Sequence, residues 1–361
     1  MKVALLISNP AVGGQRLKAG RYVEHLAAAG VEASLKSPGE AIEGRYDIVH
    51  LFNLDWPVVT AMQYRSVRRR CDRIVLSTIH HRESWMRELH RHARRGVAGV
   101  IARRVPLARF EALRGLAVSA RSPGQLPEAL RQFVTGTRAA QARLLDSVDL
   151  SLVLAEGELA SLTQDFGFDG PVAEVRNGAS TAHASPPPGL PDEFLLTVGR
   201  IEARKNQQLL LRVAVEMDLP VVLVGPSNPR HKAISRSIAA STRASTGVIW
   251  LQSLPRDQML GLYRHAAAHV LPSWCEVVPQ VDLEAALGGT RVVTTTRGHT
   301  DEYLGPAAVY WDPASGADGL RDSIVEVLSR QKPEPRPPDD FGWGPVGRGL
   351  LKAYEKALEL R

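Results

Sequence analysis

The segment AHVLPSWCEVVPQVDLEAALGGTRVVTT, residues 268–295, contains a complete strand–helix–strand pattern. The apolar run at 268–272 predicts a buried strand, and the run at 291–295 predicts a second one. Between them, residues 280–287 have a helical pattern, and the glycine pair that follows supplies the C-terminal stop. This order predicts two parallel strands joined by a crossover helix.

Two glutamates stand eight positions apart in this segment, Glu276 in the loop and Glu284 on the helix. On one helix, eight residues advance about 800°, which would leave the two carboxylates roughly 80° apart. Because Glu276 precedes the helix, both side chains can instead point into one site beyond the carboxyl end of the strand. Pro279 is expected in the first turn of the helix, where a missing N–H is tolerated.

Strand-length apolar runs alternate with helical patterns along the whole chain, which predicts an α/β fold of parallel sheets covered by helices on both faces. The proline-rich stretches at 177–192 and 332–340 interrupt this alternation, and the second precedes a last amphipathic helix. Strands are expected at 2–8, 47–52, 73–79, 150–155 and 171–175, and then at 194–198, 220–225, 247–251, 268–272 and 291–295.

The chain is therefore expected to form two Rossmann-like domains, one at 1–180 and one at 193–332. A Pro-rich linker at 181–192 separates them, and the terminal helical segment at 333–361 is expected to pack back on the N-terminal domain. In open sheets of this kind ligands bind beyond the carboxyl ends of the strands.

The composition is that of an ordinary soluble protein, with 361 residues, 44% hydrophobic and 23% charged. No run of about 18 apolar residues is present, and the apolar start of the chain is too short for a signal-peptide core. The two cysteines, Cys71 and Cys275, offer neither a disulfide framework nor a metal cluster. The sequence thus predicts a protein of the cytoplasm.

The positive charge is concentrated in the first half of the sequence. Residues 1–180 hold 25 Lys and Arg against 18 Asp and Glu, and this difference equals the net charge of +7 of the whole chain. Many of these residues are arginines in two clusters, at 64–73 and 87–104. An anionic membrane surface attracts such residues, and a solvated charged face explains them equally well.

The loop GRIEARKNQ, residues 199–207, follows the first strand of the second domain. It places Arg200 and Lys205 at the carboxyl end of that strand. Two cations there suit a diphosphate, because arginine binds bidentately and lysine acts as a point charge. A solvated basic loop is the alternative that this stretch alone leaves open.

Several segments together resemble the retaining glycosyltransferases of family 4, which have the GT-B fold of two Rossmann-like domains facing a central cleft. VGRIEARKN and, about seventy residues later, LPSWCEVVPQVDLEAALGGTRVV resemble its Gly-Arg…Lys and Glu-x7-Glu motifs. PAVGG after the first strand, STIHH, RNG before the linker and WGPVGRGLLKAYEKAL at the end also fall where that family has comparable segments. Glu-x7-Glu alone is a weak signal, whereas the ordered set is specific.

The resemblance implies transfer of a sugar from a nucleotide diphosphate sugar to an acceptor hydroxyl, with retention of configuration and without a metal. The acceptor would be a glycan or a lipid-linked sugar, as in the biosynthesis of glycans, glycolipids or cell-surface polysaccharides. The roles that it implies are as follows: Arg200 and Lys205 hold the donor diphosphate, Glu276 contacts the transferred sugar, Glu284 contacts the ribose, Gly13 and Gly14 let the backbone approach the ligands, and His80 lies near the reacting sugar.

Pro279 departs from the family pattern, which has glycines within Glu-x7-Glu. Proline removes one backbone donor and fixes the local backbone. The N-terminus of the following helix still offers N–H groups to an anion, and those of Gln280 and Val281 are the candidates.

Three alternatives remain open. His80 can be a satisfied structural histidine at a strand end. The whole chain can be a catalytically silent GT-B-like binding or scaffold protein, as the unusual Pro279 loop suggests. The arginine clusters suggest a nucleic-acid binder, but aromatic residues make up only 6% of the chain and the usual motifs are missing, so we expect no nucleic-acid partner.

Overall fold

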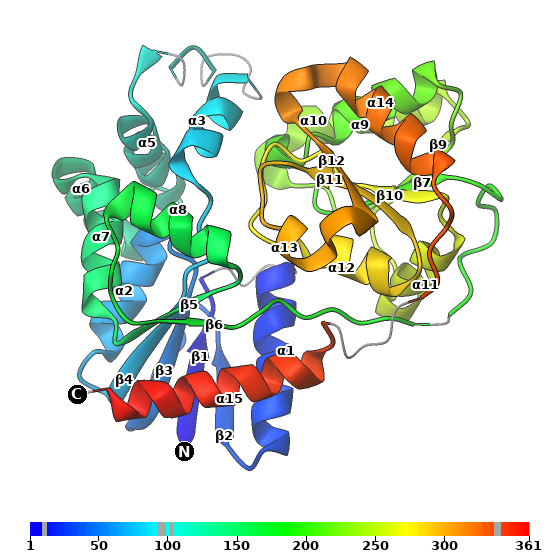
Figure 1. Cartoon of the computed structure of the whole chain (residues 1–361). Coiled ribbons are helices and arrows are strands. Elements are labelled where there is room, and N and C mark those ends of the chain that lie inside the picture. Colours follow the sequence, from blue (N-terminus) through cyan, green and yellow to red (C-terminus); the bar gives the residue numbers. More distant parts are fainter. Residues whose placement is uncertain (9–12, 93–98, 102–103, 183, 336–340, 361) are drawn as a thin grey trace. The chain divides into compact units, whose positions relative to one another are not determined.

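The computed structural model describes residues 1–8, 13–92, 99–101, 104–182, 184–335 and 341–360. Contacts divide the chain into two compact units (Figure 1). Unit 1 comprises Met1–Asn177 and Trp343–Arg361, and unit 2 comprises Gly178–Gly342. Each is built around a sheet of six parallel strands with helices between them.

The sheet of unit 1 has the strand order β2-β1-β3-β4-β5-β6. Its strands are β1 (Lys2–Leu6), β2 (Glu32–Lys36), β3 (Tyr46–Phe52), β4 (Cys71–Ser77), β5 (Leu150–Val153) and β6 (Val172–Glu174). Its helices are α1 (Gly14–Ala28), α2 (Pro57–Val67), α3 (Glu83–His92), α5 (Leu107–Ser119), α6 (Leu126–Thr135), α7 (Thr137–Ser147), α8 (Glu156–Phe166) and α15 (Trp343–Glu359), with a 3-10 turn at Pro123–Gln125.

The sheet of unit 2 has the strand order β12-β11-β10-β7-β8-β9. Its strands are β7 (Leu195–Val198), β8 (Val221–Val224), β9 (Val248–Leu251), β10 (Ala268–Val270), β11 (Arg291–Thr295) and β12 (Ala308–Trp311). Its helices are α9 (Gln207–Glu216), α10 (Lys232–Ala244), α11 (Arg256–His265), α12 (Gln280–Leu287), α13 (Asp301–Leu304) and α14 (Gly316–Ser329), with 3-10 turns at Ala203–Lys205, Pro229–His231, Gly305–Ala307 and Pro313–Ser315.

The last helix, α15, belongs to the core of unit 1 although it follows unit 2 in the sequence. It packs beside α1, and Trp343, Leu350 and Tyr354 are buried in the same cluster as Tyr22 (Figure 1). The hydroxyl of Tyr354 lies 2.8 Å from Nδ1 of His50 on β3. A buried aromatic side chain contributes about 1.5–3 kcal/mol, so these contacts fix α15 firmly to unit 1.

The predicted α/β fold class is confirmed, and all ten expected strands correspond to strands of the structure. Two strands were not predicted, β2 with the sequence EASLK and β12 with AVYW. Both lie at a sheet edge. An edge strand pairs on one side only and needs no continuous apolar run, which explains why β2 is polar and half-exposed.

Two local predictions differ from the structure. Pro279 is not in the first turn of α12 but caps it, in an extended conformation with φ −75° and ψ 125°. The strand expected at 73–79 ends at Ser77, and Ile79 has a φ of +47°. A positive φ is costly for a β-branched residue, so this turn is held by its surroundings.

Candidate functional site

In the sheet of unit 2 the strand order reverses between β7 and β10. These two strands are neighbours and pair through Ala268 and Leu195, whereas the chain proceeds outward from them on opposite sides. The loops beyond their carboxyl ends therefore border the topological switch point, where ligands bind in open α/β sheets. Lys205 follows β7 and Glu276 follows β10, so the fold brings these two predicted residues together.

Glycines shape the ends of β7 and β8 next to this point. Gly199 has a φ of +155° and Gly225 a φ of +151°. A Cβ on Gly225 would lie 2.1 Å from the carbonyl oxygen of Gly199, which no side chain tolerates. The two backbones approach this closely because Gly225 lacks a side chain.

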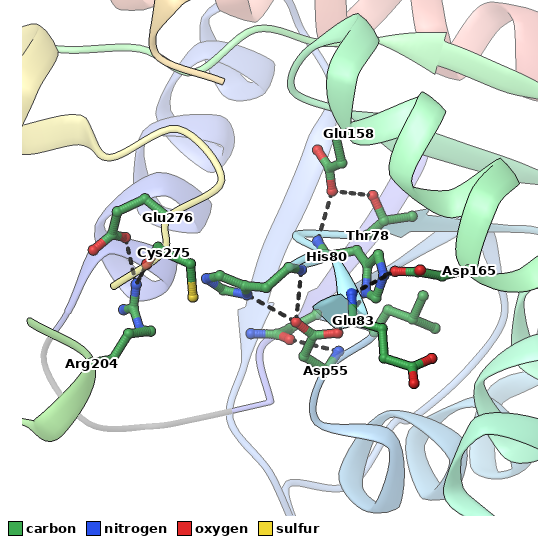
Figure 2. A network of polar contacts seen from close by, with 12 residues as sticks. Asp55, Thr78, His80, Glu83, Glu158, Asp165, Arg204, Cys275 and Glu276 are labelled. Carbon is green, nitrogen blue, oxygen red and sulfur yellow. Dashed lines mark hydrogen bonds and ion pairs between the residues drawn. The ribbon is translucent and has the colours of Figure 1, made fainter. Parts of the chain in front are cut away.

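Glu276 is the centre of a cluster of charges at the switch point (Figure 2). Its Oε1 accepts a hydrogen bond of 2.7 Å from Nζ of Lys205, and its Oε2 lies 2.6 Å from the guanidinium of Arg204. Arg204 also donates to the carbonyl oxygen of Cys275 at 2.9 Å and to Glu202 at 3.0 Å. One carboxylate is thus held between two cations.

The electrostatics of this cluster keep Glu276 ionised. Burial would raise the pKa of its carboxyl group, but the charges of Arg204 and Lys205 outweigh burial and hold the pKa well below the ordinary value. The pKa of Arg204 is raised by the neighbouring carboxylates against its own burial. A fixed carboxylate of this kind accepts hydrogen bonds from hydroxyl groups.

Arg200 lies on the same loop as Lys205, but its contact is with a different residue. Its guanidinium is 3.8 Å from Glu202, and its side chain is 37% exposed. It therefore has room to turn toward a ligand.

Glu284 on α12 is buried and is held by another cation, Arg256 of α11. Burial raises the pKa of Glu284 although the guanidinium of Arg256 opposes the shift. Glu276 and Glu284 thus have separate partners within unit 2.

The N-terminus of α12 is formed as the sequence predicts from Gln280 onward. The side chain of Gln280 donates a hydrogen bond of 3.1 Å to the carbonyl oxygen of Gly178. The backbone N–H groups of Gln280 and Val281 belong to the first turn, whose N–H groups have no intrahelical acceptor.

His80 of unit 1 lies between two carboxylates beyond the end of β4 (Figure 2). Its Nδ1 is 2.8 Å from Asp55 and its Nε2 is 3.0 Å from Asp165. Burial would lower the pKa of His80, but the two carboxylates raise it to about 10. His80 is therefore an imidazolium that donates from both ring nitrogens, and it has no lone pair with which to act as a base.

Further carboxylate acceptors hold the backbone around His80 by hydrogen bonds. Glu158 on α8 accepts hydrogen bonds from the backbone N–H of His80 at 2.8 Å and from the hydroxyl of Thr78 at 2.6 Å. The second carboxylate oxygen of Asp55 accepts from both the backbone N–H and Nδ1 of His81, each at 2.9 Å. This network also explains how the positive φ at Ile79 is maintained.

The predicted glycine site lies at the start of α1. Gly13 is the N-cap residue, and Gly14 is the first residue of the helix. One turn further on, Lys18 is buried, and its Nζ has no hydrogen-bond partner within the described part of the chain. Burial lowers the pKa of Lys18 to about 7, although the charge of Glu158 opposes this shift.

Unit 1 also has a cavity of about 300 Å³ between α3 and α5. Its lining includes the cationic or titratable side chains of Arg87, His90 and Arg91. Glu83, which also lines it, donates its backbone N–H to Asp165 at 2.7 Å, and so connects the cavity to the His80 network.

Two units, each built on a parallel six-stranded Rossmann-like sheet, have the architecture of the GT-B fold. Residues 180–337, which make up most of unit 2, match the family model of glycosyl transferases group 1.

Solved structures show the same fold over the whole chain. Sucrose-phosphate synthase from Thermosynechococcus elongatus is 17% identical, with a TM-score of 0.63 over 99% of this chain and 94% of that one. HepE of Anabaena in complex with UDP is 13% identical, with a TM-score of 0.64 over 99% of this chain and 100% of that one.

Curated relatives are D-inositol 3-phosphate glycosyltransferases. That of Frankia alni is 30% identical over 188 residues, which are 46% of this chain and 46% of the relative. That of Mycolicibacterium smegmatis is 31% identical over 189 residues, which are 47% of this chain and 42% of the relative. The chain spans about half the length of the curated relatives it matches.

Sequence reasoning missed several residues of these clusters. Arg204 stands beside Lys205 in the loop GRIEARKN, and only the structure shows that its guanidinium also reaches Glu276. Asp55 follows β3 in the motif NLDW, and its position after a strand was the signal that could have singled it out. Lys18, Glu158 and Asp165 lie on helices, where nothing in the sequence separates them from surface charges.

Proposed function

We propose that this protein is a glycosyltransferase that moves a sugar from a nucleotide diphosphate sugar to an acceptor hydroxyl with retention of configuration. The observation that carries the proposal is the cluster of Lys205, Arg204 and Glu276 at the switch point of a glycosyl transferases group 1 domain. The match to that family model and the likeness in fold to HepE, whose solved structure contains UDP, support a nucleotide-bound donor.

In this proposal Lys205 and Arg200 bind the diphosphate of the donor. Lys205 then exchanges its hydrogen bond with Glu276 for one with a phosphate oxygen, while Arg204 continues to hold the carboxylate. Glu276 accepts hydrogen bonds from hydroxyls of the transferred sugar, because its lowered pKa keeps it an acceptor.

The remaining donor contacts that the family resemblance implies are part of the same proposal. Glu284 accepts from the ribose hydroxyls, with Arg256 as its counter-charge. The N–H groups of Gln280 and Val281 contribute at the N-terminus of α12, where the helix dipole favours an anion. Gly13 and Gly14, at the start of α1, let the backbone of unit 1 approach a ligand closely.

The chemical requirement of the reaction is stabilisation of the leaving nucleotide diphosphate, since departure leaves an oxocarbenium-like sugar. Arg200, Lys205 and the N-terminus of α12 supply positive charge for this task without a metal ion. His80 contributes the fixed charge of an imidazolium, and its contacts with Asp55 and Asp165 hold it in position.

The cavity between α3 and α5 suits a phosphorylated acceptor. Arg87 and Arg91 can bind a phosphate group, and the curated relatives are named for an inositol phosphate. The basic charge of unit 1 is consistent with such an acceptor, or with a lipid-linked one in glycolipid or polysaccharide synthesis. It also suits peripheral contact with an anionic membrane.

A screen of thermal stability against nucleotide diphosphates and their sugar conjugates tests the proposal. A ligand at 100 times its Kd stabilises the folded state by about 2.7 kcal/mol, which raises the melting temperature measurably. We expect at least one nucleotide diphosphate to do so for the wild type and not for Lys205→Ala. Lack of a shift with every nucleotide would contradict it.

A binding or scaffold protein without activity is the second candidate. It is favoured by one observation, that Glu276 and Glu284 are already paired with cations in the structure. Nucleotide binding without turnover in the presence of inositol phosphates and glycan acceptors would support it.

A further inference from the structure

Helix α6 of unit 1 has its apolar side facing outward. Its buried residues include Glu128 and Gln132. Its exposed residues are the large apolar ones, with exposed fractions of 37% for Leu126, 50% for Leu130, 47% for Phe133 and 83% for Val134. These four occupy positions i, i+4, i+7 and i+8, so they form one stripe along the helix.

The orientation of α6 is fixed by its buried polar side. Glu128 forms an ion pair with Arg65 of α2, and Gln132 donates 2.8 and 3.0 Å hydrogen bonds to Glu128 and the carbonyl oxygen of Pro57. Breaking buried polar contacts of this kind is unfavourable, so rotating the helix would not hide the stripe. The contacts of its buried polar side therefore hold α6 with the stripe facing outward.

The position of α6 leaves the stripe uncovered within unit 1. The helix packs on the neighbouring helices α2, α5 and α7 (Figure 1). A contiguous group of exposed large apolar side chains in a water-soluble domain marks a surface that contacts something else.

The charges beside the stripe indicate the nature of its partner. Arg121, Arg131 and Arg143 are exposed, and the carboxylates of the span 121–146 are the buried Glu128, which lies 3.8 Å from Arg131, and the exposed Asp146. An apolar stripe with an excess of exposed arginines beside it matches an interfacial helix that inserts into an anionic lipid surface. Arginines near such a surface are attracted to its negative charge.

A second copy of this chain fits the surface less well. An interface of two identical stripes related by a twofold axis would bring the same arginines of both copies close to one another. Like charges so placed repel, whereas anionic phospholipid headgroups neutralise them.

We propose that the stripe of Leu126, Leu130, Phe133 and Val134 inserts into an anionic bilayer and holds unit 1 at the membrane surface. The site is independent of glycosyl transfer, because it uses none of the residues assigned to donor or acceptor.

Sedimentation with vesicles of phosphatidylglycerol or phosphatidylcholine tests this assignment on the full chain. We expect the wild type to bind phosphatidylglycerol vesicles at least tenfold more tightly than phosphatidylcholine vesicles. Leu130→Gln with Phe133→Gln should weaken that binding at least tenfold, because glutamine keeps helix propensity but removes the apolar contact. The matched control is Val215→Gln with Val325→Gln, two equally exposed apolar residues of unit 2 that should leave binding unchanged.

An environment-sensitive dye on Val134→Cys, in a Cys71→Ser background, separates insertion from mere adhesion. Insertion shifts its emission to the blue on addition of phosphatidylglycerol vesicles. The proposal is overturned if the wild type binds neither vesicle, if the α6 double variant binds like the wild type, or if the dye does not respond. A stable dimer that the same double variant dissociates, without vesicle binding, would assign the stripe to a second copy instead.

Discussion

The two units place opposite arrangements of charge beyond the ends of their strands. In unit 1 a cation, His80, lies between the carboxylates of Asp55 and Asp165. In unit 2 a carboxylate, Glu276, lies between the cations of Arg204 and Lys205. The first arrangement uses both ring nitrogens and a backbone N–H, whereas the second includes a lysine with three rotatable donors. The His80 cluster is therefore suited to keeping a fixed geometry. The Glu276 cluster is suited to an exchange in which Lys205 leaves Glu276 for a ligand.

The largest expected effect is on the stability of unit 1. His80→Gln leaves the buried carboxylate of Asp165 and the largely buried carboxylate of Asp55 without their shared cation, which costs about 3–5 kcal/mol of the free energy of unfolding. Chemical denaturation at pH 6.5 measures this cost, with the exposed His92→Gln as control. A loss below 1 kcal/mol would mean that the cluster is not a stabilising one.

The same cluster has a defined pH dependence. The pKa of His80 in the folded state is about 10, above the value of about 6.5 of an unfolded chain. Its contribution to stability is therefore complete below pH 6.5 and is lost as the pH rises through 10. Nitrogen NMR should find both ring nitrogens of His80 protonated at pH 8, and a neutral ring at that pH would contradict the assignment.

The next largest effect concerns turnover. Glu276→Gln removes the negative charge that positions Arg204 and Lys205, and we expect kcat to fall by about 10²-fold or more. The exposed Glu216→Gln on α9 is the control. Initial rates with the nucleotide sugar that binds measure the effect, and wild-type rates would remove Glu276 from the site.

A smaller effect is expected at the glycines of unit 2. Gly225→Ala places a Cβ against the carbonyl oxygen of Gly199 and keeps a strained φ, which costs about 2–3 kcal/mol of stability. Gly30→Ala also has a positive φ but meets no atom within 4 Å, so it should cost only about 1 kcal/mol. Equal losses in thermal unfolding would show that the close approach is absent.

The smallest effect belongs to exposed charges. Arg21 and Glu24 on α1 form an ion pair at 2.7 Å with both side chains exposed. Such pairs contribute about 0–1 kcal/mol, and Arg21→Ala should change the free energy of unfolding by less than about 0.5 kcal/mol. A larger change would mean that an exposed ion pair stabilises the fold as strongly as a buried one, so that burial would not account for the stability of the His80 and Glu276 clusters.

The sequence was most informative where the hydrophobic periodicity and the residues that end an element agree. The segment at 268–295 predicts its strands, α12 and the final glycine pair, and Gly289 has the φ of +72° that a helix stop requires. β2 escaped notice because this edge strand is polar and half-exposed, whereas β12, with the sequence AVYW, is a short apolar run that the sequence analysis passed over. The sequence also predicts that Lys205 and Glu276 each follow a strand. That these strands, β7 and β10, are neighbours is known only from the structure, and the pairing of Arg204 with Glu276 depends on side-chain directions that no pattern encodes.

Calorimetric titration of nucleotide diphosphates into the wild type, Lys205→Ala and the exposed α9 variant Arg212→Ala tests the central claim most directly. If the cluster of Lys205, Arg204 and Glu276 is the donor site, one nucleotide diphosphate binds the wild type and Arg212→Ala equally, and binds Lys205→Ala at least tenfold more weakly. Equal affinity for all three proteins, or no binding to any of them, would contradict the account.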